Sequence, residues 1–217
     1  MKAIKGLNCL CFALYAFAGL GLEVILAFLI EPLIYGTSVN EWSTIQNICH
    51  WVITCTLWGI VAFMIIRTAK QKYGFDIFVK GGKMKLLQYV LVVLCLIFML
   101  VASYIDWNGF KVIKEFHANG LLKFIFQYIY YLFETALVML IIVFGQIAFE
   151  KWFRNNKVPY GGLVAALTWG LAHGFTKGSL IAGVICAISG FIFGVTYLLV
   201  NRDVRKTYIL LFIMFVF

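Results

Sequence analysis

Long apolar runs separated by short polar segments fill this chain. A helix needs about 20 apolar residues to cross a hydrocarbon core of ~30 Å, and six runs approximate this length: 7–30, 48–66, 86–104, 124–149, 158–176 and 179–200. A seventh run, 207–217, has 11 residues and reaches only ~16 Å as a helix. The pattern predicts an all-α fold, a polytopic helical membrane bundle of six full spans plus a short C-terminal seventh hydrophobic segment, in a single membrane domain over 1–217.

The composition narrows the class of protein. Hydrophobic residues make up 64% of the chain and charged residues 12%, against about 45–50% and about 25% in soluble domains. This excludes a soluble domain, a disordered chain, a disulfide scaffold and a coiled coil. In a soluble protein the net charge of +9 would favour nucleic acid as a partner. In a membrane protein, lysine and arginine collect in the loops on the inner side, so we expect a lipid bilayer and no nucleic acid.

The distribution of basic residues over the loops predicts the orientation. With the N-terminus inside, 14 lysines and arginines fall on the inner side and 4 on the outer side, as the positive-inside rule requires. We therefore expect a multi-pass protein of the cell membrane, the bacterial cytoplasmic membrane, with its N-terminus inside. Two connecting segments, 73–85 and 107–123, mix lysines with large apolar residues. They are expected to lie in the membrane interface or to form ordered loops.

Ionisable side chains inside the spans are the first candidates for function, because burying them in a membrane is costly. Glu23, Glu134 and His173 all lie ~22–24 Å from the inner ends of their spans, at ~1.5 Å per residue, and His50 begins the second span from the outer side. One layer in the outer third of the membrane can hold all four. Since the fourth and fifth spans are joined by a short connection, they are expected to be antiparallel neighbours, and Glu134 is expected to meet His173.

Such a Glu–His contact has two interpretations, a lock between two helices or a centre for chemistry. Glutamate and histidine are also acceptable metal ligands. No HExxH or similar spacing is present, so we predict neither a metal nor a cofactor.

Two helix faces are expected to meet protein rather than lipid. At 100° per residue, one face of the fourth span contains Gln127, Tyr131 and Glu134. The sixth span has a face of small residues that permits close helix approach: Gly183, Ala187, Gly190 and Gly194.

Sequence motifs in the last third of the chain resemble those of a known family. Residues 169–173 read Trp-Gly-Leu-Ala-His, and a glycine-rich run over 180–199 contains Tyr197. They are similar to the FxxxH motif and the following glycine-rich span of the CPBP family (CAAX protease and bacteriocin-processing, or Abi) of intramembrane peptidases. The resemblance covers a core at 124–217, while 1–123 would be additional N-terminal spans.

Other family motifs are depleted here. The stretch 145–150, Gly-Gln-Ile-Ala-Phe-Glu, looks like EEIAFR, which would put Gly145 and Gln146 where the family has two glutamates. A second alignment, over 149–154, keeps Glu150 and Arg154 but loses the first glutamate. In the last segment, 208–216 resembles PILLHFLIN, with phenylalanine at 212 for the histidine and valine at 216 for the asparagine.

The family mechanism implies a glutamate and a histidine that activate a water against a peptide bond. The residues here that fit such roles are His173, Glu134, Glu150 and Arg154. Because the other acids and bases are missing, the leading hypothesis is a pseudo-peptidase that binds a membrane-protein or peptide partner. One alternative is an active intramembrane endopeptidase that uses Glu134 or Glu150 with His173. Another is a small transporter or channel component with a buried Glu/His layer.

Overall fold

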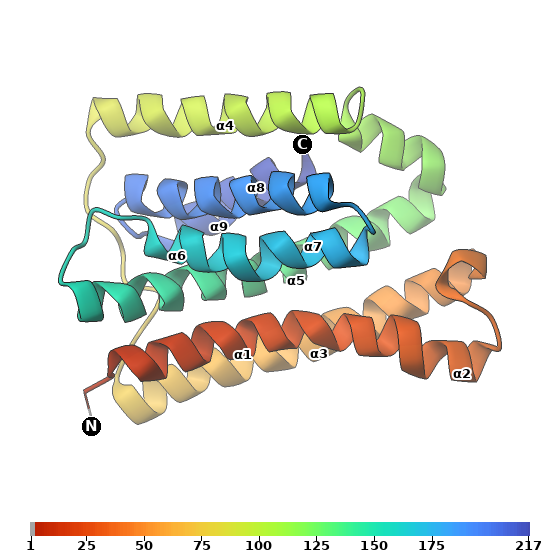
Figure 1. Ribbon diagram of the computed structural model, residues 1–217, viewed down its shortest axis with the longest axis horizontal. Coiled ribbons are helices and arrows are strands. Elements are labelled where there is room, and N and C mark those ends of the chain that lie inside the picture. The colour runs from red at the N-terminus through yellow and green to blue at the C-terminus, as the bar shows by residue number, and fades with distance from the viewer. Residues whose placement is uncertain (1–2) are drawn as a thin grey trace.

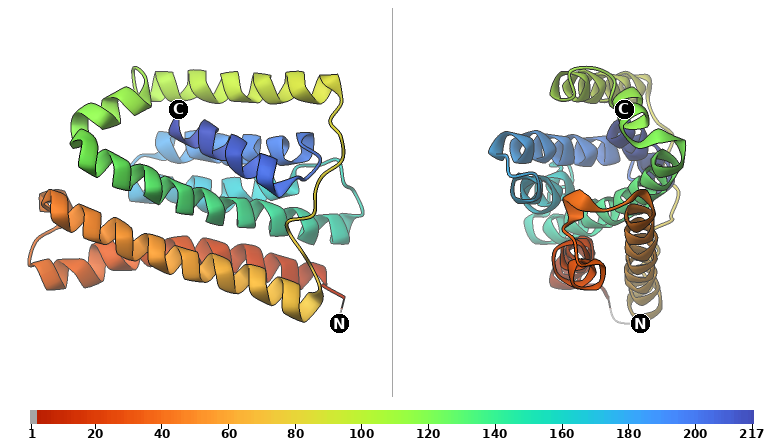
Figure 2. Two further views of the ribbon diagram at one scale, coloured as in Figure 1. Left: turned by 180° about the vertical axis from the view of Figure 1, so that it is seen from behind. Right: turned by 90° about the vertical axis from the view of Figure 1, so that its right-hand side faces the viewer.

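The computed structural model describes residues 3–217 and is helical over most of that range, without strands in it (Figure 1). The first helical hairpin pairs α1 with α3, and α5 runs through the centre of the bundle (Figure 2). The elements are α1 (Gly6–Ile25), the π turn η1 (Leu26–Ile30), α2 (Glu31–Tyr35), the 3-10 turn η2 (Val39–Glu41), α3 (Thr44–Tyr73), α4 (Leu86–Asp106), α5 (Lys111–Phe153), α6 (Tyr160–Ala165), the π turn η3 (Ala166–Gly170), α7 (Leu171–Thr176), α8 (Leu180–Leu199) and α9 (Val204–Val216).

The predicted all-helical membrane class is confirmed in its coarse form. In the part of the chain that the structure describes, five helices are long and apolar enough to cross a membrane: Gly6–Tyr35, Thr44–Tyr73, Leu86–Asp106, Lys111–Phe153 and Leu180–Leu199. The fifth expected run is helical but is divided by η3 into α6 and α7, each of 6 residues. The short last run forms α9, which has 13 residues. The count of six spans and a seventh segment therefore stays a prediction, as does the orientation.

Local sequence signals explain where several helices begin and end. Ser43 begins α3 with a capping box, in which its hydroxyl accepts from the Gln46 N–H and its own N–H donates to the Gln46 side chain at 2.8 Å. Gly74 ends α3 in the left-handed conformation, with φ of 64°. Pro32 has no N–H for the carbonyl four residues earlier, and the first helix widens into η1 just before it.

The central helix α5 bends sharply near its start. Gly120 has φ of 67° and ψ of 172°, values that favour glycine, and they divide α5 into a short piece across the end of the bundle and a long piece along it (Figure 2). Residues 137–144 are at most 5% exposed, so α5 is covered on every side there. In contrast, α4 lies at the edge, where most of its side chains face outward.

Glycines allow the helical segment 160–176 to lie directly against α8. A Cβ atom added to Gly190 would be 3.0 Å from the backbone nitrogen of Ala166, and one added to Gly194 would be 2.2 Å from the Cα atom of Gly162. The expected close approach of the small-residue face of α8 is therefore confirmed. Because these neighbours are backbone atoms, they cannot move aside for a side chain.

Basic residues gather at one end of the bundle, where the start of α1 and the C-terminal ends of α3, α5 and α8 lie together, on the left in Figure 1. The lysines and arginines assigned above to the inner side belong to this end, except Lys2, which lies outside the described residues. Here the expected interface segment 73–85 docks on the turn before α9. The side chain of Asn201 donates to the carbonyl of Lys83 at 3.0 Å, and Gln88 donates to the Asn201 side chain at 2.8 Å.

Asp203 fixes this docking and begins α9. Its carboxylate, 6% exposed, accepts from the backbone N–H groups of Arg205, Lys206 and Gly81 at 3.1, 3.2 and 3.3 Å. Burial raises the pKa of Asp203, but the hydrogen bonds from the Lys206 and Gly81 N–H groups lower it by more, so its pKa lies below the ordinary value.

A first prediction concerns the glycine packing. Gly194→Ala is expected to lower the free energy of unfolding in detergent by about 1–3 kcal/mol, because the added methyl group meets backbone. Gly21→Ala is the matched control, since nothing lies within 4 Å of an added Cβ there; helix propensity favours that change by up to ~1 kcal/mol. Equal unfolding midpoints for the two variants would contradict the close packing.

A second prediction concerns pH. A lowered pKa in the folded state means that the Asp203 carboxylate stabilises the fold above its unfolded pKa, and that this contribution disappears as pH falls through the folded value. Asp203→Asn keeps a capping oxygen without the charge, so it should be less stable than wild type by about 0.3–1 kcal/mol at neutral pH. Unfolding midpoints measured from neutral to acidic pH should converge; a gap that stays constant would show that the charge has no role.

Candidate functional site

A cavity of about 550 Å³ opens near the end of the bundle opposite the basic end. Side chains from α1, η1, α3, α5, η3, α7 and α9 line it, together with Trp107 and Lys177. Among its ionisable lining residues are Glu23, Lys111, Glu115, Glu134, His173 and Lys177. Three of the four residues expected in one membrane layer thus share a single cavity, and the polar face predicted for α5 lines it through Gln127, Tyr131 and Glu134.

Trp169 joins the two central residues of the cavity. Its indole N–H donates to Oε1 of Glu134 at 2.9 Å, and its backbone carbonyl lies 2.8 Å from Nδ1 of His173. The rings of Trp169 and His173 pack edge to face, with centroids 4.7 Å apart. Glu134 is only 6% exposed, and a buried carboxylate requires a donor of this kind.

These contacts fix which nitrogen of His173 faces the carboxylate. A carbonyl oxygen can only accept, so Nδ1 has the proton and donates. In the neutral ring Nε2 is then an acceptor, and it lies 3.9 Å from Oε1 of Glu134. The expected Glu134–His173 approach is therefore confirmed in geometry. With His173 neutral and Glu134 ionised, it presents two acceptors side by side. A donor group placed between them satisfies both.

Glu115 and Lys111 form a second polar cluster at the rim. The Glu115 carboxylate, 3% exposed, accepts from the hydroxyls of Tyr131 and Tyr128 at 2.6 and 3.0 Å. The ammonium of Lys111 donates to the carbonyl of Phe215 at 2.8 Å and lies 4.6 Å from the centre of the Tyr131 ring. Both charged groups belong to the short first piece of α5, which the Gly120 bend folds over the cavity.

Glu23 connects the cavity to a third cluster around His50. The Tyr130 hydroxyl donates to Oε1 of Glu23 at 2.8 Å, and Nε2 of His50 lies 3.6 Å from the same oxygen. On its other side, Nδ1 of His50 lies 2.5 Å from Oε2 of Glu31. His50 therefore bridges two carboxylates, one of which, Glu31, is 2% exposed and does not line the cavity.

The other two candidate residues lie at the basic end of the bundle, away from the cavity. Glu150 is ~24 Å from Glu134 along α5, at ~1.5 Å per residue, and accepts from Arg202 at 2.7 Å. Arg154 is exposed and ends α5 with φ of 53°. A dyad of Glu150 with His173 does not form, because the length of α5 separates them.

The positions aligned with other family residues also lie apart from the cavity. The side chain of Gln146 is fully buried and bonds to the Gly161 N–H, the Val158 carbonyl and Glu150. From α9 only Phe215 lines the cavity, not its neighbours at 212 and 216.

Sequence reasoning missed Trp169 as a donor, and also Lys111, Glu115 and Glu31. Lys111 and Glu115 are four residues apart, a spacing that would have indicated neighbouring charges on one helix face. The segment was instead expected to lie in the interface or in a loop. Within residues 3–217, no group of three or more histidine, cysteine, aspartate or glutamate side chains is arranged to hold a metal ion.

Comparisons with known proteins add no relative. No family model, no curated protein and no solved structure matches the chain. The geometry of the cavity is therefore the basis for any functional conclusion.

A third prediction tests the role of Trp169. Trp169→Phe removes the indole donor and leaves Glu134 unsatisfied, which should lower the free energy of unfolding by about 1–3 kcal/mol beyond the effect of the smaller ring. Combining it with Glu134→Leu should recover part of that loss, because both polar partners are then gone. A double-mutant cycle on unfolding in detergent measures this coupling; strictly additive effects would exclude the bond as a stabilising contact.

Proposed function

We propose that this chain is a multi-pass protein of the cell membrane, with a CPBP-like core, that binds a membrane-inserted peptide segment in the cavity of Glu134 and His173 without cleaving it. The collection of lysine and arginine at one end supports placing that end, with the N-terminus, on the inner side of the membrane. The cavity then lies toward the outer face.

The observation that carries this proposal is the pair of facing acceptors. Nε2 of His173 accepts no hydrogen bond within residues 3–217, and it faces Oε1 of Glu134 at 3.9 Å, an oxygen that accepts from the Trp169 indole and has a second lone pair to offer. Leaving a buried acceptor such as Nε2 unsatisfied in an apolar environment is costly. A ligand that supplies an N–H group to this point is therefore favoured over a hydrocarbon.

The other charges of the cavity favour a ligand that has both donors and acceptors. Glu23 lines it from α1 and Glu134 from the long piece of α5. Lys111 lines it from the short piece of α5 before Gly120, and Lys177 from the turn after α7. A peptide backbone offers N–H and C=O groups together. The cavity volume of about 550 Å³ is typical of sites for a few residues or a small molecule.

We propose that the peptide is not cleaved because the polar side chains around Glu134 are already hydrogen-bonded to one another. Tyr130 donates to Glu23, Tyr131 donates to Glu115, and Trp169 donates to Glu134. Stabilising a developing oxyanion needs donors aimed at it. The ammonium of Lys111 is held by the Phe215 carbonyl and aromatic rings, and Lys177 belongs to the exposed turn after α7.

A second candidate function is peptide hydrolysis by Glu134 and His173. The specific observation in its favour is the same 3.9 Å separation, since one water can hydrogen-bond to both atoms and lose a proton to either of them. Binding is preferred because it requires no further group.

The test uses purified protein in nanodiscs and fluorescent hydrophobic peptides with and without a central lysine. Binding is measured by anisotropy, and peptide mass is followed in the same samples. We expect saturable binding that Ala172→Trp weakens by about tenfold or more, because the new ring overfills the cavity at a cost of about 1–3 kcal/mol. Val93→Trp, on the outward face of α4, is the matched control and should bind as wild type does.

The outcomes separate the two candidates. Binding with intact peptide mass supports a binding protein. Cleavage that both Glu134→Gln and His173→Ala abolish would show instead that the protein is a peptide hydrolase. Binding that Ala172→Trp leaves unchanged would overturn both assignments of the cavity.

A further inference from the structure

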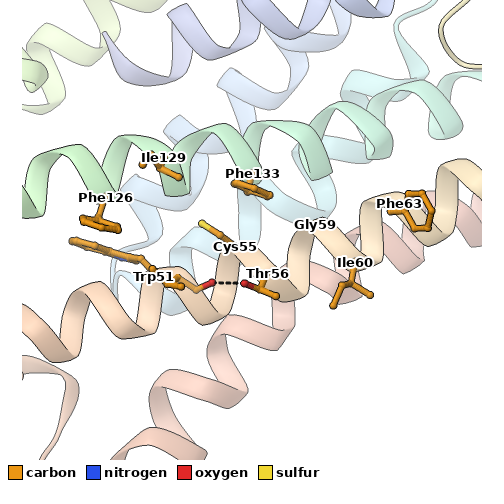
Figure 3. A pocket seen from close by; sticks show the side chains of 10 residues that line it. Trp51, Cys55, Thr56, Gly59, Ile60, Phe63, Phe126, Ile129 and Phe133 are labelled. Carbon is orange, nitrogen blue, oxygen red and sulfur yellow. Dashed lines mark hydrogen bonds between the residues drawn. The ribbon is translucent and has the colours of Figure 1, made fainter.

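A separate apolar groove of about 450 Å³ runs along the outside of the bundle between α3 and α5 (Figure 3). Its lining residues are Trp51, Val52, Cys55, Thr56, Gly59, Ile60, Phe63, Phe126, Ile129 and Phe133. Both helices are long and apolar enough to cross the membrane, so the groove faces the lipid. It shares only Trp51 with the cavity described above.

The groove offers few hydrogen-bonding groups along its length. Its one hydroxyl, on Thr56, donates to the Val52 carbonyl at 2.8 Å, the dashed line in Figure 3. Apart from the indole N–H of Trp51 at one end, the remaining lining side chains are aliphatic, aromatic or a thiol. An occupant with buried polar groups would leave them unsatisfied, so the chemistry of the walls selects a hydrocarbon chain.

The shape of the groove also fits one extended chain. Trp51 and Phe63, at its two ends in Figure 3, are 12 residues apart on α3, or ~18 Å, which is a little more than half of a ~30 Å hydrocarbon core. Gly59 forms part of the floor, beneath the ring of Phe133. This length matches a chain that belongs to a single leaflet.

A cation at the aromatic end supplies a partner for a headgroup. The ammonium of Lys123 lies 5.9 Å from the centre of the Trp51 ring, at the first turns of the long piece of α5 after the Gly120 bend. Within residues 3–217, no carboxylate forms an ion pair with it. At the other end, the side chain of Arg67 near Phe63 is held by a hydrogen bond to Gln71.

We propose that the groove is a binding site for an anionic phospholipid, with one acyl chain along α3 and α5 and the phosphate on Lys123. Hydrocarbon contacts determine where the lipid lies, and the lysine selects for negative charge. The site is distinct from the peptide cavity and does not depend on the function proposed for it.

The experiment uses quenching of Trp51 by brominated acyl chains. Protein is reconstituted in phosphatidylcholine nanodiscs with increasing fractions of brominated phosphatidylglycerol, or of brominated phosphatidylcholine as the uncharged probe. Subtracting the signal of Trp51→Phe isolates the fluorescence of Trp51 from that of the other tryptophans. We expect quenching that saturates at low fractions of phosphatidylglycerol and increases only in proportion to the fraction of phosphatidylcholine.

Variants assign the headgroup and the groove. Lys123→Gln should weaken binding by about fivefold, the effect of one lysine at an anionic surface, and Arg67→Gln, the matched control, should leave it unchanged. Gly59→Leu should remove saturation by filling the floor. If that variant does not fold, Ile60→Trp blocks the same groove from its exposed wall.

Three results would overturn the proposal. Equal quenching by the two brominated lipids would mean that only bulk lipid touches Trp51. Weakening by Arg67→Gln and not by Lys123→Gln would place the headgroup at the wrong end. Saturation that survives both groove-filling variants would exclude the groove as the site.

Discussion

The need to satisfy a carboxylate buried among apolar helices is the constraint on which the cavity depends. Because Glu134 is buried, its carboxylate needs a hydrogen-bond donor from the protein, and the Trp169 indole N–H provides it. The same residue accepts from His173 through its carbonyl. One tryptophan therefore determines both the position of the carboxylate and the tautomer of the imidazole, and it leaves their facing atoms as two acceptors.

This arrangement requires that the segment 160–176 stays close to both α5 and α8. Glycines at the contacts let backbones touch, as at Gly190 and Ala166, and the hydrogen bond from Gly161 to Gln146 ties the segment to α5 at its other end. Helix packing and the polar cavity thus support each other. Loose packing of this segment would move Trp169 away from Glu134.

The two ends of the bundle use polar residues differently. At the basic end, Glu150 pairs with Arg202, and Asp203 and Asn201 hold the 73–85 segment in place. These groups satisfy one another and have a structural role. At the other end the polar groups surround an open cavity, and the pair at its centre has unused acceptors.

The amino-acid pattern was enough to predict the helical membrane class, the separation of basic residues between the two ends, and the common depth of Glu23, Glu134 and His173. This was possible because helix rise converts sequence distance into depth, and helix periodicity assigns each residue to a face. The packing of remote helices was needed to show that Trp169 is the donor to Glu134, that Glu115 lines the cavity, and that Glu31 lies against His50. These outcomes depend on which remote helix each face meets and on the bend at Gly120, and the period of a single helix contains no information about its neighbour.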